Sequence, residues 1–445
     1  MILTNKPGIL YRLFKAYLRF FYDRIYYRRT YSLQTDHIPV DGTPLLIVSN
    51  HQNCGHDPLG ILFAIRDRKP AFIARADVFT YHPLLAKFLY ANGMLPAYRI
   101  AYEGEAALNK NKEMLRHTGR ELLNGRTVVM YPEAGHQDKH WLGAFSFGYT
   151  RLAFEAAALG NFRTEIFILP SCNHYADYFQ LQEQMLVKFG TPISIKPYYE
   201  LYKTKPRTAQ REVNTLVRKQ IEDLMLDIRD LDNYQAIDFV CKAVADRNAL
   251  SGAEDLPGRL LSDRALVASL AQAQTNDGAA VREIYSDALT LQEGIREMKI
   301  NNRLFDRPFT WGALAGRSLL LVLLLPVWLF SLWPNVLHLV APALLQRRMT
   351  DKMFYGTFIY ALSVLITIPV FYTLTFVLTW IYVNLWIALI YLVSLPFWGL
   401  FAWYYRKFFM ETRQAWHYHI HRKTEKLQAL KKIRTDLYNR LDELK

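Results

Sequence analysis

The stretch IVSNHQNCGHDPLG, residues 47–60, joins an apolar run to a helical pattern. The run PLLIV at 44–48 predicts a buried strand, and Pro58 is typical of the first turn of a helix. His51 therefore follows a strand end, and Asp57 stands at the start of the next helix, so the two side chains can meet in one cleft. An imidazole oriented by a carboxylate is a workable general base.

Two other interpretations of this stretch stay open. Asp57 is also a suitable helix N-cap, and His51 is then an ordinary loop histidine. A metal site made of His51, His56 and Asp57 is disfavoured, because the adjacent residues His56 and Asp57 would have to turn the same way. No second histidine cluster in the sequence supports such a site.

Strand-like and helix-like patterns alternate through residues 36–205, which indicates an α/β domain with a sheet flanked by helices. Apolar runs predict strands at 44–48, 71–74, 127–131, 166–169 and 185–189. Helical patterns lie between them at 58–66, 82–90, 106–123 and 146–160. Sites in such domains lie at strand ends, which is where His51 stands.

Four motifs in this domain resemble those of the glycerolipid acyltransferases, the lysophosphatidate acyltransferase superfamily. They are Asn50-His51 with Asp57, the run NGMLPAYR at 92–99, the run YPEAG at 131–135 and the run ILP at 168–170. Their order matches the family, and they stand about one strand–helix unit apart. The first motif departs from the family pattern, because five residues rather than four separate the histidine from the aspartate. The resemblance covers residues 40–200.

The resemblance implies roles for the later motifs. Arg99 holds the phosphate of the acceptor, since a planar guanidinium matches phosphate oxygens. Glu133 and Gly135 belong to the motif that binds the glycerol part of the acceptor. Pro170 ends an apolar strand near the acyl-chain site.

The third motif also departs from the family. Ala134, Gly135 and His136 replace its Gly-Thr-Arg, so the arginine that would bind phosphate is missing. Lys139 is the predicted substitute, and His136 and His140 are alternatives.

The implied activity is transfer of a fatty acyl group from an acyl thioester to a hydroxyl of lysophosphatidate or glycerol 3-phosphate. His51 takes the hydroxyl proton and Asp57 orients the imidazole. No metal or cofactor is expected, and acyl-CoA or acyl-carrier protein is the co-substrate. Two alternatives remain: another lipid acceptor, such as an acyl-amino-acid lipid, or a membrane scaffold whose catalytic site has decayed.

The composition favours a membrane partner. The 445 residues carry a formal charge of +14 and are 14% aromatic, and two long stretches lack charge. This combination favours a membrane surface over nucleic acid. Three scattered cysteines form no metal-ligand pair, and the N-terminus lacks the pattern of a signal peptide.

Residues 8–29 predict an interfacial helix with one aromatic face and one basic face. The uncharged stretch 353–405 predicts two membrane spans joined by a turn near 380–384. The stretch 318–346 contains three prolines and predicts a re-entrant hairpin bent near Trp333. Basic residues at both ends of 353–405 place the catalytic domain on the cytoplasmic side of the inner membrane.

The predicted organisation has five parts. They are an N-terminal helix at 1–35, the acyltransferase domain at 36–205, a soluble helical arm at 206–310, an α-helical membrane domain at 311–410 and a basic tail at 411–445.

Overall fold

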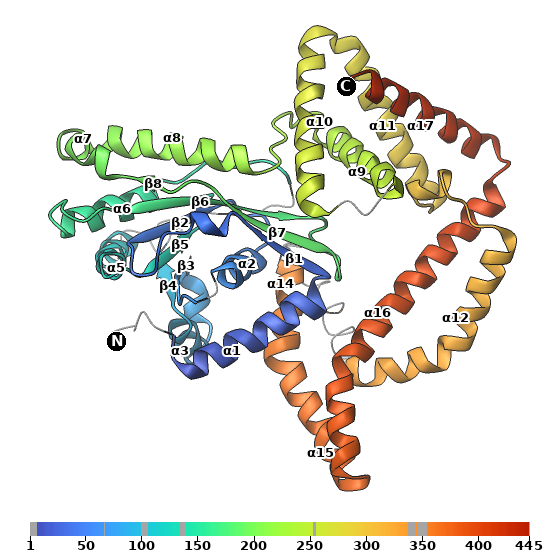
Figure 1. Ribbon diagram of the computed structural model, residues 1–445, viewed down its shortest axis with the longest axis horizontal. Coiled ribbons are helices and arrows are strands. Elements are labelled where there is room, and N and C mark those ends of the chain that lie inside the picture. Colours follow the sequence, from blue (N-terminus) through green and yellow to red (C-terminus); the bar gives the residue numbers. More distant parts are fainter. Residues whose placement is uncertain are drawn as a thin grey trace. The chain divides into compact units, whose positions relative to one another are not determined.

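The computed structural model of the protein describes residues 7–65, 67–98, 106–133, 135, 139–251, 255–336, 344 and 354–444. The chain divides into two compact units. The first comprises Met1–Asp227 and Thr350–Tyr360, and the second comprises Ile228–Met349 and Ala361–Lys445. Each unit has its own packing and is described by itself (Figure 1).

A mixed sheet of eight strands forms the centre of the first unit within the described residues. Its order is β1 (Arg29–Leu33), β7 (Gln184–Phe189), β6 (Phe167–Tyr175), β2 (Leu45–Ser49), β5 (Thr127–Met130), β3 (Ala71–Arg75) and β4 (Met94–Ala97), with β8 (Ile193–Ser194) beside β6. β2 runs parallel to both β5 and β6, whereas β7 is antiparallel to β6. The predicted sheet is confirmed, and β1, β4 and β8 are additional strands.

Helices pack on the sheet, as predicted. They include α2 (His56–Ala64), α3 (Pro83–Ala91), α5 (Ala106–Leu123), α6 (Gly148–Leu159), α7 (Tyr199–Thr204) and α8 (Pro206–Leu224). β2 has all five residues buried, because it lies in the middle of the sheet with neighbours on both sides. The residues that follow β2 are therefore held by a rigid frame.

The structure divides the chain at Asp227, whereas the predicted arm begins at residue 206. The amphipathic pattern of α8 is the physical reason. Its apolar residues Ala209, Val213, Val217 and Ile221 are completely buried in the core of the first unit. The pattern shows that the helix has a face to bury, but not which surface receives it.

The N-terminal helix consists of α1 (Ile9–Phe20) followed by a π-helical segment, Phe21–Tyr26. One residue of its basic side faces the domain: Lys15 is buried, and its ammonium donates to the backbone oxygens of Ile65 and Arg68 at 3.2 Å each, whereas Arg12 is exposed. The apolar residues Leu10 and Leu13 are exposed. This arrangement suits a helix that meets a membrane with its apolar face.

The helix α14 (Phe354–Leu362) contributes its first turns to the first unit. The Tyr360 hydroxyl donates to the backbone oxygen of Leu18 at 2.6 Å. A segment distant in sequence is therefore part of the first unit, which the predicted boundaries do not include.

The second unit contains the amphipathic helices α9 (Tyr234–Ser251), α10 (Leu256–Asn276), α11 (Gly278–Met298) and α17 (Glu425–Glu443). Ion pairs join α17 to the others: Arg247 binds Asp442 at 2.8 Å, and Arg440 binds Asp287 at 2.5 Å and Glu283 at 2.9 Å. The predicted boundary at 410/411 falls inside α16 (Leu385–His421), a single helix of 37 residues.

Three helices of the described chain are long and apolar enough to cross a membrane: Trp311–Asn335, Gly356–Tyr382 and Leu385–His421. Between 11% and 22% of their most apolar windows is buried, so most of these apolar side chains face outward. The turn after α15 (Thr373–Tyr382) falls at residues 383–384, inside the predicted range.

The helix α12 (Trp311–Leu332) contains Pro326 and changes direction along its course (Figure 1). It ends in a 3₁₀ turn at Trp333–Asn335, where the hairpin bend was expected. The Asn335 amide oxygen accepts from the Tyr372 hydroxyl at 3.3 Å and lies beside Gly399 of α16. Gly399 is well inside the uncharged part of α16, which fits a helix that stops within the membrane. The return leg lies largely outside the described residues, and the hairpin stays a prediction.

Candidate active site

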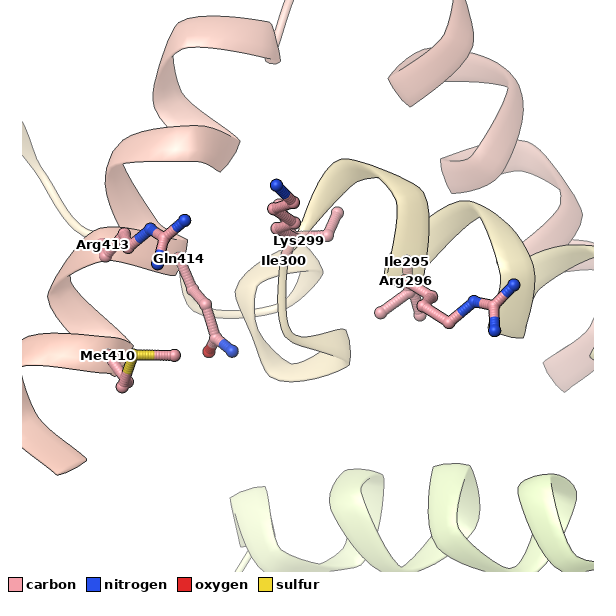
Figure 2. A pocket seen from close by; sticks show the side chains of 7 residues that line it. All are labelled: Ile295, Arg296, Lys299, Ile300, Met410, Arg413 and Gln414. Atoms are coloured by element: carbon pink, nitrogen blue, oxygen red, sulfur yellow. The ribbon is translucent and has the colours of Figure 1, made fainter. Parts of the chain in front are cut away.

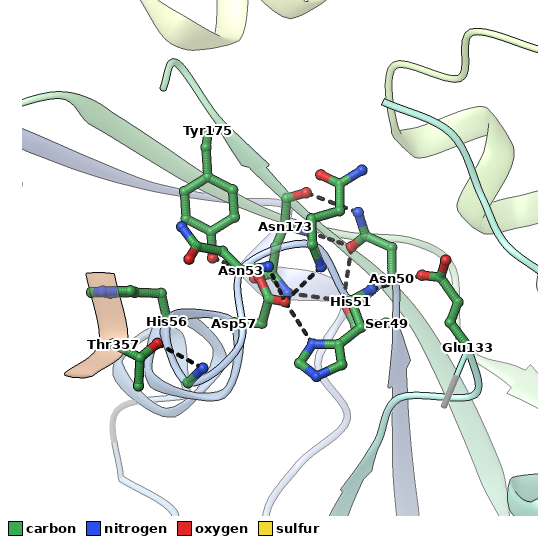
Figure 3. A network of polar contacts seen from close by, with 12 residues as sticks. Ser49, Asn50, His51, Asn53, His56, Asp57, Glu133, Asn173, Tyr175 and Thr357 are labelled. Atoms are coloured by element: carbon green, nitrogen blue, oxygen red, sulfur yellow. Dashed lines mark hydrogen bonds and ion pairs between the residues drawn. The ribbon is translucent and has the colours of Figure 1, made fainter. Parts of the chain in front are cut away.

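The site lies at the carboxyl ends of the parallel strands β2, β5 and β6, where the segments that follow β2 and β5 come together (Figure 3). Val48 of β2 pairs with Met130 of β5, and Ser49 pairs with Ser171 of β6. His51 follows β2 and Glu133 follows β5, while β6 continues past the same level. Carboxyl ends of parallel strands meet at one edge of a sheet, so these residues converge.

His51 and Asp57 make the contact that a catalytic dyad requires. His51 Nδ1 lies 2.7 Å from Asp57 Oδ2, with the Asp57 side chain fully buried and the His51 side chain 19% exposed. A carboxylate only accepts, so Nδ1 carries the proton and Nε2 is the basic nitrogen. Asp57 Oδ2 also accepts from the backbone N–H groups of Gln52 at 2.8 Å and Asn53 at 2.9 Å, and Oδ1 accepts from the Tyr175 hydroxyl at 2.6 Å.

The five-residue gap is closed by a tight turn. The backbone N–H of His56 donates to the Asn53 oxygen at 2.9 Å, and Cys54 adopts a positive φ of 39°. The turn brings the N–H groups of Gln52 and Asn53, which precede α2, within hydrogen-bond distance of the Asp57 carboxylate in the first turn of α2. The N-cap of α2 is Gly55, without a side-chain cap, so the alternative that Asp57 is the N-cap is wrong.

Asn50 extends the β2–β6 ladder with its side chain. Its amide nitrogen donates to the Asn173 oxygen at 3.0 Å, and its amide oxygen accepts from the Asn173 N–H at 2.7 Å. The Asn173 side chain in turn donates to the Ser49 hydroxyl at 3.1 Å. This pair of amides fixes the chain immediately before His51.

Glu133 holds the backbone of His51. Its Oε1 accepts from the His51 N–H and its Oε2 from the Gly143 N–H, each at 2.7 Å. Burial raises the pKa of the Glu133 carboxyl, and these two hydrogen bonds oppose the shift. The Tyr131 ring stacks on the imidazole with centroids 4.5 Å apart. One carboxylate thus fixes the ring of His51 and a second fixes its main chain.

His56 lies in a different environment from its neighbour Asp57. Its ring is fully buried among the tyrosine rings of Tyr22, Tyr26, Tyr27 and Tyr360, with centroids 4.4–5.8 Å away. This burial lowers the pKa of His56 to about 4, although Gly356 and Asp57 oppose the shift, so the ring is neutral at pH 7. Figure 3 shows it apart from the His51 ring. No group of three metal-binding side chains occurs among the described residues.

The turn also receives a contact from α14. The Gly55 N–H donates to the Thr357 hydroxyl at 2.9 Å, and a Cβ on Gly55 would lie 2.5 Å from the Thr357 methyl carbon. A glycine is therefore required here by close approach.

Of the predicted acceptor residues, Glu133 lies beside His51, and the alternative His140 is buried. Arg99 lies outside the described residues, as do His136 and the neighbouring residues 137–138. Gly135 is exposed, with open space around it. Lys139 is exposed too, and its backbone oxygen accepts from the Gln52 side chain at 3.0 Å, which ties this loop to the dyad turn.

Pro170 lies inside β6, and the prediction that the strand ends there is wrong. The Pro170 oxygen accepts from the Gly190 N–H at 2.8 Å. In a strand, the N–H and C=O of one residue point to the same side, so an N–H at position 170 would also point toward Gly190. Gly190 lies between β7 and β8, where the neighbouring ladder is interrupted. The missing donor therefore costs no ladder bond, and the strand continues to Tyr175.

Three residues of the site were not predicted: Asn173, Tyr175 and Thr357. Asn50 stands in the first motif, but no role was predicted for it. Asn173 and Tyr175 stand two apart on β6, the period of a strand face, and a polar run after an apolar strand is a usable signal. Thr357 lies 302 residues from Gly55 and carries no such signal.

Part of the chain is similar to known proteins. Residues 28–173 match a family model described as Acyltransferase. The chain is also similar to the crystal structure of the 1-acyl-sn-glycerophosphate (LPA) acyltransferase PlsC from Thermotoga maritima. The identity is 18% and the TM-score 0.30, over 46% of this chain and 77% of that one. A search of curated proteins gives no match.

Proposed function

Because residues 28–173 match an acyltransferase family model and the four motifs resemble those of the glycerolipid acyltransferases, we propose that the protein acylates a glycerol phosphate lipid precursor at a membrane. The donor is acyl-CoA or acyl-carrier protein. The acceptor is lysophosphatidate or glycerol 3-phosphate, and lysophosphatidate is preferred. The product enters phospholipid synthesis.

The chemistry is direct transfer. His51 Nε2 takes the proton of the acceptor hydroxyl as that oxygen attacks the thioester carbonyl. The carbon–sulfur bond breaks, the thiolate leaves and takes up a proton, and an ester remains. Asp57 holds the ring and stabilises the imidazolium.

The contact between His51 Nδ1 and Asp57 Oδ2 at 2.7 Å is the single observation that carries this proposal. The buried carboxylate orients a partly exposed imidazole, which is the arrangement a general base needs. It also argues against a decayed site, because the five-residue gap does not separate the pair.

The acceptor phosphate is assigned to Arg99, with Lys139 in place of the arginine that the third motif lacks. Gly135 leaves room beside Glu133 for the acceptor, and Pro170 is assigned to the acyl-chain side. These roles come from the resemblance. The contacts of Glu133 with the His51 and Gly143 N–H groups also support a positioning role for its carboxylate.

The membrane placement follows from the apolar helices. Exposed apolar side chains on α12, α15 and α16 suit lipid contact. We place the protein in the inner membrane with the acyltransferase domain in the cytoplasm, where acyl thioesters and glycerol phosphates occur.

The test is an acyl-transfer assay on the purified full-length protein with acyl-CoA and acyl-carrier-protein donors. The acceptor panel contains lysophosphatidate, glycerol 3-phosphate and a hydroxylated acyl-amino-acid lipid without phosphate. Transfer to a phosphate-bearing acceptor is expected. Transfer only to the phosphate-free lipid, or to none of them, contradicts the proposal.

A further inference from the structure

A basic pocket lies in the second unit, between the end of α11 and the part of α16 beyond its uncharged stretch (Figure 2). It has a volume of about 410 Å³. Its lining combines three cations with apolar and amide side chains: Arg296, Lys299, Arg413, Ile295, Ile300, Met410 and Gln414. No carboxylate is among the residues that line it.

Two of the cations are not neutralised by the described protein. Figure 2 shows the charged ends of Lys299 and Arg413 on adjacent sides of the pocket. Among the described residues, neither has a carboxylate within salt-bridge distance. The acidic neighbours have other partners: Glu293 binds Arg296 at 2.7 Å, and Glu297 binds Lys426. Like charges placed together without a counter-ion are unfavourable, and an anion between them removes that cost.

The backbone at the end of α11 carries the partial negative charge of a helix C-terminus, which favours the Lys299 ammonium and gives no attraction for an anion. Lys299 adopts the left-handed conformation of a helix C-cap, with a φ of 52°. Its N–H donates to the Arg296 oxygen, and the Ile300 N–H donates to the Ile295 oxygen, each at 3.1 Å. These bonds satisfy two of the last carbonyls of the helix and use the N–H groups of Lys299 and Ile300, so any attraction for an anion comes from the side chains.

The height of the pocket along α16 places it at the headgroup level of a bilayer. The uncharged part of α16, from Leu385 to Tyr405, covers about 30 Å at a rise of about 1.5 Å per residue, which equals the hydrocarbon thickness. Met410 follows roughly 8 Å further on and Arg413 about 12 Å further on, whereas the headgroup layer is about 5–8 Å thick. The pocket therefore begins at the outer edge of this layer, and the long Arg413 side chain can reach back toward it.

Tryptophans mark the same boundary. The rings of Trp311 and Trp416 lie 5.7 Å apart, and the Trp416 nitrogen donates to the Ser318 hydroxyl at 3.0 Å. Tryptophan is enriched at membrane interfaces. Arg317 spans between the helices at this level, with its Nε donating to the Thr412 hydroxyl at 3.0 Å.

We propose that this pocket binds the phosphate headgroup of an anionic phospholipid, a site separate from the catalytic dyad. Lys299 and Arg413 contact the phosphate, Gln414 donates its amide, and Met410 and Ile295 face the glycerol and the first acyl carbons. Basic pockets at the membrane edge of a helical domain favour such headgroups. The proposal rests on the membrane placement of α16 given above.

The test uses the full-length protein in nanodiscs of phosphatidylcholine, titrated with phosphatidate and followed by native mass spectrometry. The double variant Lys299→Gln/Arg413→Gln is expected to bind phosphatidate on the order of 10- to 30-fold more weakly. The matched control, Lys431→Gln/Lys432→Gln, removes the same charge from exposed positions on α17 and should stay within about twofold of wild type. Arg413→Lys should retain most of the binding.

Three outcomes overturn the proposal: unchanged binding in the Lys299/Arg413 variant, an equal loss in the Lys431/Lys432 control, or equal competition by soluble glycerol 3-phosphate, which would mark a site for free phosphate. Acyl transfer by the Lys299/Arg413 variant should stay within about twofold of wild type. A failure of the catalytic proposal therefore leaves this result intact, and flotation with vesicles tests the membrane placement by itself.

Discussion

Asp57 lies fully buried with four hydrogen-bond donors on its two oxygens, whereas Gly135 and Lys139, on the proposed acceptor side of the site, are exposed. The base half of the site is therefore specified by the fold alone. The proposed acceptor half presents side chains to solvent, where they are accessible to a substrate. Changes in the base half should lower kcat, and changes in the acceptor half should raise the KM for one substrate.

The largest effect is expected for His51→Ala. Loss of a general base typically costs ~100- to 10,000-fold in rate, and the protein should remain folded and membrane-bound. Steady-state kinetics measure the loss. The matched control is His117→Ala on the exposed face of α5, which should keep full activity. A His51→Ala enzyme within a few-fold of wild type would remove His51 from the mechanism.

Asp57→Asn should lower kcat by roughly 100-fold, because an amide neither stabilises an imidazolium by charge nor accepts as many donors. Asp223→Asn, on the exposed face of α8, is the control. Circular dichroism and thermal melts separate activity from stability. Unchanged turnover in Asp57→Asn would show that its contact with His51 is only structural.

On the acceptor half, Arg99→Ala should raise the KM for the acceptor by about 10- to 100-fold, the value of a hydrogen bond between charged groups. The KM for the donor should change little. Lys139→Ala should show a smaller loss of the same kind, which would assign it the role of the absent arginine. Equal effects on both substrates would count against a phosphate site.

Glu133→Gln sharpens the division between the halves, because Glu133 is predicted for acceptor binding and yet holds the main chain of His51. We expect a loss of about 10-fold in kcat, with the KM for the acceptor within about threefold of wild type. An amide keeps one acceptor oxygen for two N–H groups, so one bond is lost. A rise in the KM for the acceptor with unchanged kcat would move Glu133 to the acceptor half.

The features predicted from the sequence are those formed by residues that lie close together in the chain. The strand before His51, the helix after it and the meeting of His51 with Asp57 follow from one continuous stretch. Contacts between distant segments leave no local pattern in the sequence. Tyr175 lies 118 residues from Asp57, and Thr357 lies 302 residues from Gly55.

The wrong strand end at Pro170 and the unassigned packing surface of α8 have the same origin. A proline usually ends a strand, but here its missing N–H falls at a break between two neighbouring strands. An amphipathic helix needs a surface to cover, and only the assembled sheet shows that α8 covers β6. In both cases the residue types show what is needed: a position without a ladder bond for Pro170 and a surface to cover for α8. The tertiary neighbours determine where each is found.

A double-mutant cycle tests most directly whether His51 and Asp57 act as one unit across the five-residue gap. kcat/KM is measured for wild type, His51→Ala, Asp57→Asn and the double variant. If Asp57 acts only through the His51 ring, the double variant loses no more activity than His51→Ala alone. If the two losses multiply, the residues act independently, and the account of the site as a dyad is wrong.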